Sequence, residues 1–313
     1  MFASFFVIVI SIYCSEKLDG MAAAAIVMRH AILSKLPVHF GGFLHIDALE
    51  DELEDIARDE HKLVFVLDVS LSPNHLLLLD KINEKNKIVY WNTHDAESVV
   101  PPARMFDRAL GNQCSAELAQ QRFLPNDLIA KTLAELAHEV KFWQLKDERA
   151  SKLSDLISAQ YGPVELIDSL ARGIVWNDQF EAFHKEHMKR KLVAFDELLS
   201  SLVVKSYVNY RFGFAVASSI LTTADACQKI IDGHAGVDVA VVLYRDGRIG
   251  FRRRDVCDVD VKKLAELFNG GGRPFAAGAK LTLQVTKESF PDVLFHLDEA
   301  FKNFFVGRVV DNL

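Results

Sequence analysis

Acidic side chains and a histidine follow three apolar runs of the sequence, at the point where each run ends. They are Asp19, Asp68 and the pair His94 and Asp95. Carboxylate oxygens and an imidazole nitrogen are hard donors, which suit Mn²⁺ or Mg²⁺ better than zinc. One acidic residue in a loop would mean little, because such residues are common there. Three in matching positions favour a site for a divalent metal ion.

A second candidate site is the segment 269–278, which reads Asn-Gly-Gly-Gly-Arg-Pro-Phe-Ala-Ala-Gly. Its small residues let backbone N–H groups approach a ligand closely and adopt left-handed geometry. A plain turn is the alternative. Residues 245–280 carry nine Lys or Arg against five Asp or Glu, a net charge of +4 that leaves −11 for the rest of the chain. This local charge favours an anion site over the plain turn.

The elements that must position these residues alternate in the first half of the chain. Apolar runs predict buried strands, and amphipathic or alanine-rich stretches between them predict helices. The strands are expected at 5–14, 63–67 and 87–91, and the helices at 21–30, 48–60 and 74–84. This alternation predicts a parallel sheet, in which ligands bind at the carboxyl ends of the strands.

The rest of the chain divides into a helical middle and a second domain. Helical periodicity covers 109–122, 126–143 and 147–160, where we find no motif beyond what packing explains. We predict a parallel-sheet α/β domain over 1–175, a helical connector over 176–202 and a smaller mixed α/β domain over 203–313. The second domain is expected to hold strands at 203–208, 210–217, 237–244, 249–252 and 281–285 and helices at 224–231 and 261–268.

Composition agrees with a soluble two-domain protein. The chain has 313 residues, of which 50% are hydrophobic and 25% charged, with a net charge of −7. These values exclude disordered and fibrous classes and argue against a protein that coats nucleic acid generally. The four cysteines are scattered, which predicts neither a zinc site nor disulfides and suits the cytoplasm. No Lys or Arg precedes Lys17, so we read the first apolar run as a strand and not as a secretion signal.

The glycine-rich segment carries a family resemblance. Gly-Gly-Gly-Arg-Pro-Phe-Ala-Ala-Gly resembles the Gly-Gly-Gly-His-x-x-Ala-Ala-Gly signature of the C-terminal substrate-binding domain of DHH-family phosphoesterases, the RecJ-like and oligoribonuclease-like enzymes. The resemblance implies that Gly270, Gly271, Gly272 and Arg273 bind substrate phosphate, together with Arg252. Arg273 stands where the family has a histidine. An arginine still binds phosphate but cannot shuttle a proton.

The N-terminal half joins the same resemblance. The family's His-x-Asp-x-Asp-Gly motif falls on residues 15–20, its second-motif aspartate on Asp68 and its Asp-His-His on residues 93–95. The candidate for its fourth aspartate is Asp147, and the alternative is that Asp147 is a charge on a helix surface. In the family these motifs hold two Mn²⁺ ions. The resemblance implies that the ligands of one ion are lost to Ser15 and Lys17. It implies that Asp19, Asp68, His94 and Asp147 hold one remaining ion, Mn²⁺ or Mg²⁺.

Lys17 and Asp95 are the catalytic candidates. A lysine about 4 Å from a dication costs roughly 8 kcal/mol at an effective dielectric near 20, so an ion at the lost site would need Lys17 displaced or neutral. We therefore expect Lys17 to replace the missing ion as a fixed cation that faces phosphate. Asp95 stands where the family has its second histidine.

By this resemblance, the chain is a metal-dependent phosphodiesterase. Its substrates would be short single-stranded oligonucleotides or small nucleotide phosphodiesters, bound across the interdomain cleft and cut by metal-activated water. No membrane partner is implied, and the chain could form a homodimer. The alternative is an inactive relative that still binds nucleic acid or a protein partner. It is supported by the departures from the family pattern at Ser15, Lys17, Thr93, Asp95 and Arg273.

Overall fold

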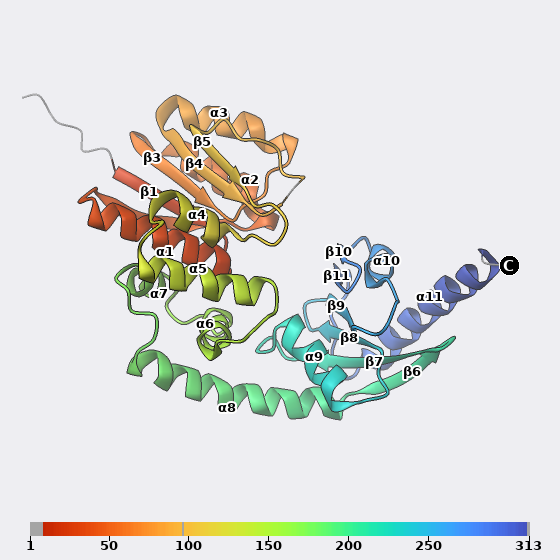
Figure 1. The fold of residues 1–313 in the computed structure, drawn as a ribbon. Helices are drawn as coiled ribbons and strands as arrows, with labels where there is room; N and C mark the ends of the chain where they lie inside the picture. Colours follow the sequence, from red (N-terminus) through yellow and green to blue (C-terminus); the bar gives the residue numbers. More distant parts are fainter. Residues whose placement is uncertain (1–8, 96, 312–313) are drawn as a thin grey trace, which may run out of the picture. The chain divides into compact units, whose positions relative to one another are not determined.

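The structure is a computed structural model that describes residues 9–95 and 97–311. It divides into two compact units, residues 1–184 and 185–313, and the boundary falls within the long helix α8 (Asp178–Ser200) (Figure 1). Residues 5–8 of the first predicted strand lie outside the described range. Each unit has its own sheet and its own hydrophobic cores.

Unit 1 contains a five-stranded, fully parallel sheet, as the sequence predicts. Its order is β2-β1-β3-β4-β5, and the three central strands are the predicted apolar runs. The edge strands β2 and β5 were not predicted. The bounds are β1 (Val9–Cys14), β2 (Val38–Phe43), β3 (Lys62–Leu67), β4 (Lys87–Thr93) and β5 (Met105–Arg108).

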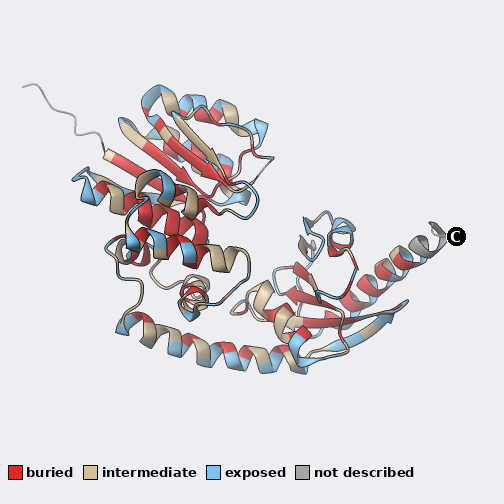
Figure 2. Cartoon of the chain, viewed as in Figure 1, coloured by how far each residue is buried: buried red, intermediate tan, exposed pale blue. Residues whose placement is uncertain are grey.

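Helices cover both faces of this sheet. The alanine-rich helix α1 packs between the strands and α4, α5 and α7, while α2 and α3 cover the other face with a separate core. The bounds are α1 (Leu18–Leu33), α2 (Leu49–Arg58), α3 (Leu76–Lys85), α4 (Ser115–Phe123), α5 (Leu128–Lys141), α6 (Glu148–Ser158) and α7 (Pro163–Ala171), with short 3₁₀ turns at Ile46–Ala48 and Pro73–His75. Figure 2 shows buried residues along α1 and the strands of both sheets.

The strand order places a switch point at β1. The chain passes from β1 to β2 on one side and then to β3 on the other side of β1. In open parallel sheets, ligands bind beyond the carboxyl ends of the strands at such a reversal, because the loops there diverge. Asp19, in the first turn of α1, and Asp68, in the loop after β3, lie beyond the carboxyl ends of β1 and β3.

Unit 2 contains a six-stranded mixed sheet of order β10-β11-β9-β8-β7-β6, in which only the β7–β8 pair is parallel. One face packs against α9 and the C-terminal half of α8, and the other against α10 and α11. The bounds are β6 (Val203–Tyr207), β7 (Tyr210–Ala217), α9 (Thr223–Gly233), β8 (Val239–Tyr244), β9 (Arg248–Arg253), α10 (Val261–Glu266), β10 (Gly271–Arg273), β11 (Ala276–Lys280) and α11 (Phe290–Asp311).

The predicted strand at 281–285 is wrong. The glycine-rich segment itself supplies the strands, because β10 and β11 form an antiparallel hairpin and β11 pairs with β9. Residue 281 only continues that edge through one bond, from its backbone N–H to the carbonyl of Gly247 at 2.8 Å. Among the described residues, no helix is both long enough and apolar enough to cross a bilayer.

Candidate functional site

Asp19 lies in the first turn of α1, directly beyond β1, and is buried. Its two carboxylate oxygens accept the backbone N–H groups of Ser115 at 3.2 Å and Ala116 at 2.8 Å. These groups belong to the N-terminus of α4, where free N–H groups and the helix dipole favour a negative charge. Gly20 makes the tight turn feasible, because a Cβ there would come within 2.4 Å of the Ser15 hydroxyl.

Asp68 follows β3 directly and is the centre of the cluster. Its backbone has a left-handed φ of 58° and donates its N–H to the side-chain oxygen of Asn92 at 2.8 Å. Its carboxylate accepts the hydroxyls of Ser15 at 2.5 Å and Ser115 at 3.2 Å. The left-handed turn after the strand therefore aims a buried carboxylate back over the sheet edge.

His94 completes a group of three candidate ligands. It follows β4, and its Nδ1 lies 2.6 Å from a carboxylate oxygen of Asp68. Among the described residues, Asp19, Asp68 and His94 are the group whose donor atoms all lie within 4.8 Å of one another. The structure thus brings together three of the predicted ligands at the switch point of the sheet.

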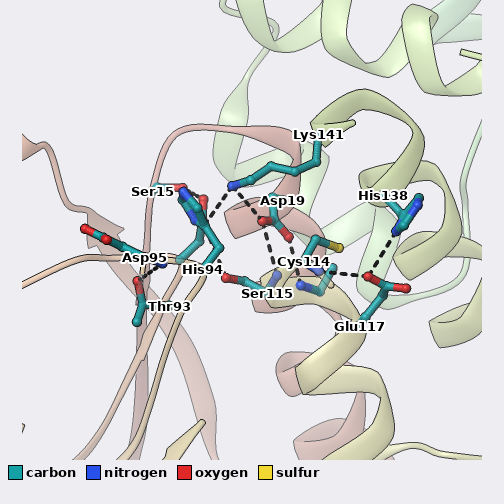
Figure 3. A network of polar contacts seen from close by, with 12 residues as sticks. Ser15, Asp19, Thr93, His94, Asp95, Cys114, Ser115, Glu117, His138 and Lys141 are labelled. Carbon is teal, nitrogen blue, oxygen red and sulfur yellow. Dashed lines mark hydrogen bonds and ion pairs between the residues drawn. The ribbon is translucent and has the colours of Figure 1, made fainter. Parts of the chain in front are cut away.

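Lys141 is the residue of this site that the sequence did not indicate. It ends α5, and its ammonium lies 3.2 Å from an oxygen of Asp19 and 3.5 Å from an oxygen of Asp68. Figure 3 shows the side chain reaching across to Asp19. Only 13% of the side chain is exposed. A fixed cation therefore lies between the two carboxylates that were predicted as metal ligands.

The pKa values of the Asp68 and Asp19 carboxyl groups are shifted in opposite directions. For Asp68, burial alone would raise the pKa, but the hydrogen bond from His94 and the charge of Lys141 outweigh it and hold the pKa below its usual range. For Asp19, burial and the neighbouring charge of Asp68 raise the pKa despite Lys141 and the helix N-terminus. Asp68 is therefore the carboxyl group of the pair that ionises more readily.

The other three candidates of unit 1 lie outside this cluster. Lys17 is the exposed N-cap residue of α1. Asp95 caps a local turn, accepting the backbone N–H of Glu97 at 2.9 Å, and its carboxylate points away from Asp19 and Lys141 in Figure 3. Asp147 caps α6 and forms an ion pair with Arg149 at 2.6 Å. The group of clustered donor atoms does not include Asp147.

The donor set fits one hard divalent ion. Two carboxylates and one imidazole within 4.8 Å supply oxygen and nitrogen donors of the kind that Mn²⁺ prefers. The hydroxyl of Ser15 donates a hydrogen bond to the other oxygen of Asp68 at 2.5 Å. Lys141 uses two of the same carboxylate oxygens. An ion at this site therefore competes with Lys141.

In unit 2, the glycine-rich hairpin forms one wall of a groove of about 560 Å³. Its lining includes Arg252, Gly271 and Gly272 from the predicted set, and Arg248 and the start of α9, which the sequence did not indicate. Gly270 and Arg273 are not in this lining. Arg273 is exposed at the hairpin turn, with its guanidinium 5.9 Å from the ring of Phe275.

Some glycines and arginines of this region are engaged by the fold of unit 2 itself. Gly270 donates its N–H to the carbonyl of Ala265 at 2.9 Å, and a Cβ there would lie 2.2 Å from the carbonyl of Gly278. Arg254 donates to the carbonyls of Val237 at 3.1 Å and His234 at 3.2 Å. Gly270 and Arg254 therefore contribute to the fold of unit 2.

Comparisons with known proteins agree with this architecture. Residues 212–303 match the sequence model of the DHHA1 domain. A search of curated proteins by sequence finds no match.

Three solved structures are similar in fold over 94% of the chain. One is RecJ with Mn²⁺ from Thermus thermophilus, with a TM-score of 0.61, 13% identity and 52% of that chain covered, so this chain spans about half of it. Another is the DHH domain of a member of the s1p family of ribosomal proteins, with a TM-score of 0.64, 13% identity and 87% covered. The third is the pGpG-specific phosphodiesterase PggH from Vibrio cholerae, with a TM-score of 0.55, 11% identity and 99% covered.

Proposed function

We propose, for a chain that carries a DHHA1 domain and has the fold of the DHH-family phosphoesterases, that it is a metal-dependent phosphodiesterase. The observation that carries the proposal is the convergence of Asp19, Asp68 and His94 within 4.8 Å. The three lie beyond the carboxyl ends of three strands, Asp19 in the first turn of α1 after β1, Asp68 after β3 and His94 after β4. Such a convergence of hard donors is typical of a site for Mn²⁺ or Mg²⁺.

Each residue of the site has a definable task. Asp19, Asp68 and His94 would hold one ion, which when bound lowers the pKa of a water molecule and polarises a phosphoryl oxygen. The N-terminus of α4 fixes the Asp19 carboxylate through Ser115 and Ala116. Asn92 fixes the backbone of Asp68. These hydrogen bonds to Asp19 and Asp68 orient the two proposed ligands, so their geometry is set before an ion binds.

The proposed substrate class is supported by features of unit 2. The groove beside the glycine-rich hairpin is large enough for a nucleotide, and Arg248 and Arg252 lie in its lining. Arginines bind phosphate with paired donors. Short single-stranded oligonucleotides and small nucleotide phosphodiesters fit these features. The fold neighbours include a protein described as a pGpG-specific phosphodiesterase.

The test is hydrolysis by the full chain with and without Mn²⁺. The substrates are pGpG and a five-nucleotide RNA, and released mononucleotides are measured by chromatography. We expect Mn²⁺-dependent release that falls at least about 100-fold in Asp68→Asn, because a ligand to the ion is lost. Asparagine suits this test, since it tolerates the left-handed φ of 58° at this position. Equal rates in the two proteins would reject the proposal.

A second candidate function is a phosphate-binding protein without hydrolytic activity. The observation that favours it is Lys141, which already satisfies both carboxylates without an ion. In that case the full chain binds the five-nucleotide RNA but releases no mononucleotide at any Mn²⁺ concentration. The same assay therefore separates the two functions.

A further inference from the structure

The ammonium of Lys141 occupies the position where an ion would meet Asp19 and Asp68. Its distances of 3.2 and 3.5 Å to the two carboxylates show that one cation serves both. The side chain is 13% exposed, so the interaction is weakly screened by water. Without a cation, two carboxylates 3% and 1% exposed would face each other at close range. Lys141 therefore supplies the counter-charge that an ion would otherwise supply.

An ion and this ammonium cannot share the site. An ion coordinated by the two carboxylates would lie roughly 4 Å or less from an ammonium bonded to the same oxygens, where the repulsion between the two charges is strong. The donors of the ammonium and the ion also need the same lone pairs. Ion binding thus requires that Lys141 leaves.

The chain provides a place for the displaced side chain. Lys141 also lines a cavity of about 340 Å³, together with Glu16, Lys17, Asp19, Ser154, Ser158 and Gln160. Besides Asp19, this lining offers the Glu16 carboxylate, which accepts a hydrogen bond from Gln160 at 3.0 Å, and two hydroxyls. Lys17 is a second cation in the same lining. Rotation of a flexible four-carbon stem is enough to move an ammonium from the carboxylates into this cavity.

We propose that Lys141 is a tethered competitor of the divalent ion, with one position on Asp19 and Asp68 and another in the adjacent cavity. The first position keeps the metal-free site neutralised and ordered. The second is adopted when an ion binds. This proposal rests on the proposed function, because both concern the same ligands, and it adds a level of control: the chain's own lysine sets the ion concentration at which the site fills.

The first test is calorimetric titration of the full chain with Mn²⁺. The variants are Lys141→Met and the control Lys131→Met, which removes a lysine from the exposed side of the same helix, where it is 63% exposed. We expect Lys141→Met to bind Mn²⁺ at least about tenfold more tightly than the wild type, because the competing charge is gone. The control should stay within about twofold, since an exposed charge is screened. Unchanged or weaker binding by folded Lys141→Met would overturn the proposal.

A second measurement uses the wild-type chain, which avoids any doubt about the folding of the variant. Reductive methylation followed by peptide mass spectrometry reports how accessible each lysine is. We expect Lys141 to react more slowly than Lys131 without Mn²⁺ and to react faster once Mn²⁺ is saturating. A Lys141 rate that Mn²⁺ leaves unchanged or lowers contradicts the displacement.

The Mn²⁺-binding and methylation results can be distinguished from a failure of the proposed hydrolase activity. Tighter Mn²⁺ binding by Lys141→Met without any hydrolysis of pGpG supports the competitor and rejects the enzyme. Mn²⁺-dependent hydrolysis by the wild type, with equal Mn²⁺ affinity in the variant, rejects the competitor alone.

Discussion

The carboxylate of Asp19 accepts the backbone N–H of Ala116 at 2.8 Å, although 97 residues separate the two in the sequence. This bond joins the first turn of α1 to the first turn of α4. It fixes the position of one proposed ligand independently of any ion. The neighbouring N–H of Ser115 binds the second oxygen of the same carboxylate at 3.2 Å.

Asp19→Asn should abolish ion binding while the fold is kept. An asparagine oxygen can still accept the N–H of Ala116, but the amide NH₂ then faces the N–H of Ser115, donor against donor. The negative charge that binds the ion is lost. We expect Mn²⁺ affinity to fall at least about 100-fold, measured by calorimetry, with an unchanged near-ultraviolet circular dichroism spectrum. The matched control is Asp51→Asn on the exposed side of α2. If both variants keep wild-type affinity, Asp19 is not a ligand.

Arg273→Ala should weaken the binding of a labelled five-nucleotide RNA equally for different sequences, because contacts to phosphate carry no sequence information. With about three phosphate contacts in the wild type, log K should fall against log salt with a slope of roughly −2. We expect the slope to become shallower by about 0.7 in the variant. Fluorescence anisotropy with the full chain at several salt concentrations measures both quantities. A slope near zero in the wild type contradicts phosphate binding.

Arg254→Ala should reduce stability, in contrast to Arg273→Ala, which should reduce RNA binding. Arg254 donates to backbone carbonyls at the end of α9 and in the following loop, so its removal leaves acceptors without a donor. We expect a loss of about 1–3 kcal/mol in the free energy of unfolding. Arg273→Ala, at an exposed turn, should change it by less than about 0.5 kcal/mol. Denaturant titration compares the two, and equal losses would contradict this division of tasks.

Adjacent glycines of the hairpin should respond oppositely to alanine. Gly270→Ala places a methyl group 2.2 Å from the carbonyl of Gly278, whereas a Cβ at Gly271 meets no atom within 4 Å. We expect Gly270→Ala to cost about 1–3 kcal/mol of stability and Gly271→Ala to cost little. Gly271 lines the groove, so its variant should instead weaken RNA binding. Thermal unfolding measures the stability of both variants, and fluorescence anisotropy measures their RNA binding. A Gly270→Ala variant as stable as the wild type would show that the hairpin can relax around the added methyl group.

Unit 2 should become less stable in acid, because protonation of Asp298 removes a stabilising charge. Burial alone would raise its pKa, but Lys302, Tyr207 and Lys205 lower it to about 2. A depressed pKa contributes stability above the unfolded value near 4, and this contribution is lost as the pH falls from about 4 to about 2.

The matched variant for that group is Asp298→Asn. We expect it to lose about 1–2 kcal/mol at pH 7, discounted because Lys302 is 62% exposed, and less than about 0.5 kcal/mol at pH 2, where most of the charge contribution is gone. Urea unfolding at both pH values measures the difference. A loss of the same size at pH 2 would assign the effect to packing and not to charge.

The sequence predicts the parts of this fold that repeat a simple pattern. The central strands β1, β3 and β4 are continuous apolar runs, and the predicted ligands follow them because the carboxyl ends of parallel strands meet at one edge. The short edge strand β5 carries no such signal. The hairpin strands were missed because Gly and Ala are poor strand formers in isolation, and pairing with β9 overrides that preference.

Lys141 could not be found from its neighbours in the sequence. It is one of several lysines on helices of the middle region, and its local pattern is that of an ordinary helix end. Its role arises because α5 packs on α1 and directs that end over Asp19 and Asp68. Asp147 shows the converse: its sequence position suggested a ligand, but the start of α6 and Arg149 engage its carboxylate.

Helix α1 has a run of four alanines, Ala22–Ala25, each 0% exposed. The helix packs closely on α4 and α5, the two helices that carry Ser115, Ala116 and Lys141. An added methyl group on the sides of the run that face α4 and α5 would push these helices away, and a shift of about 1 Å is large on the scale of a hydrogen bond. The small side chains of α1 thus set the distance from Asp19 to the groups of α4 and α5 that contact its carboxylate.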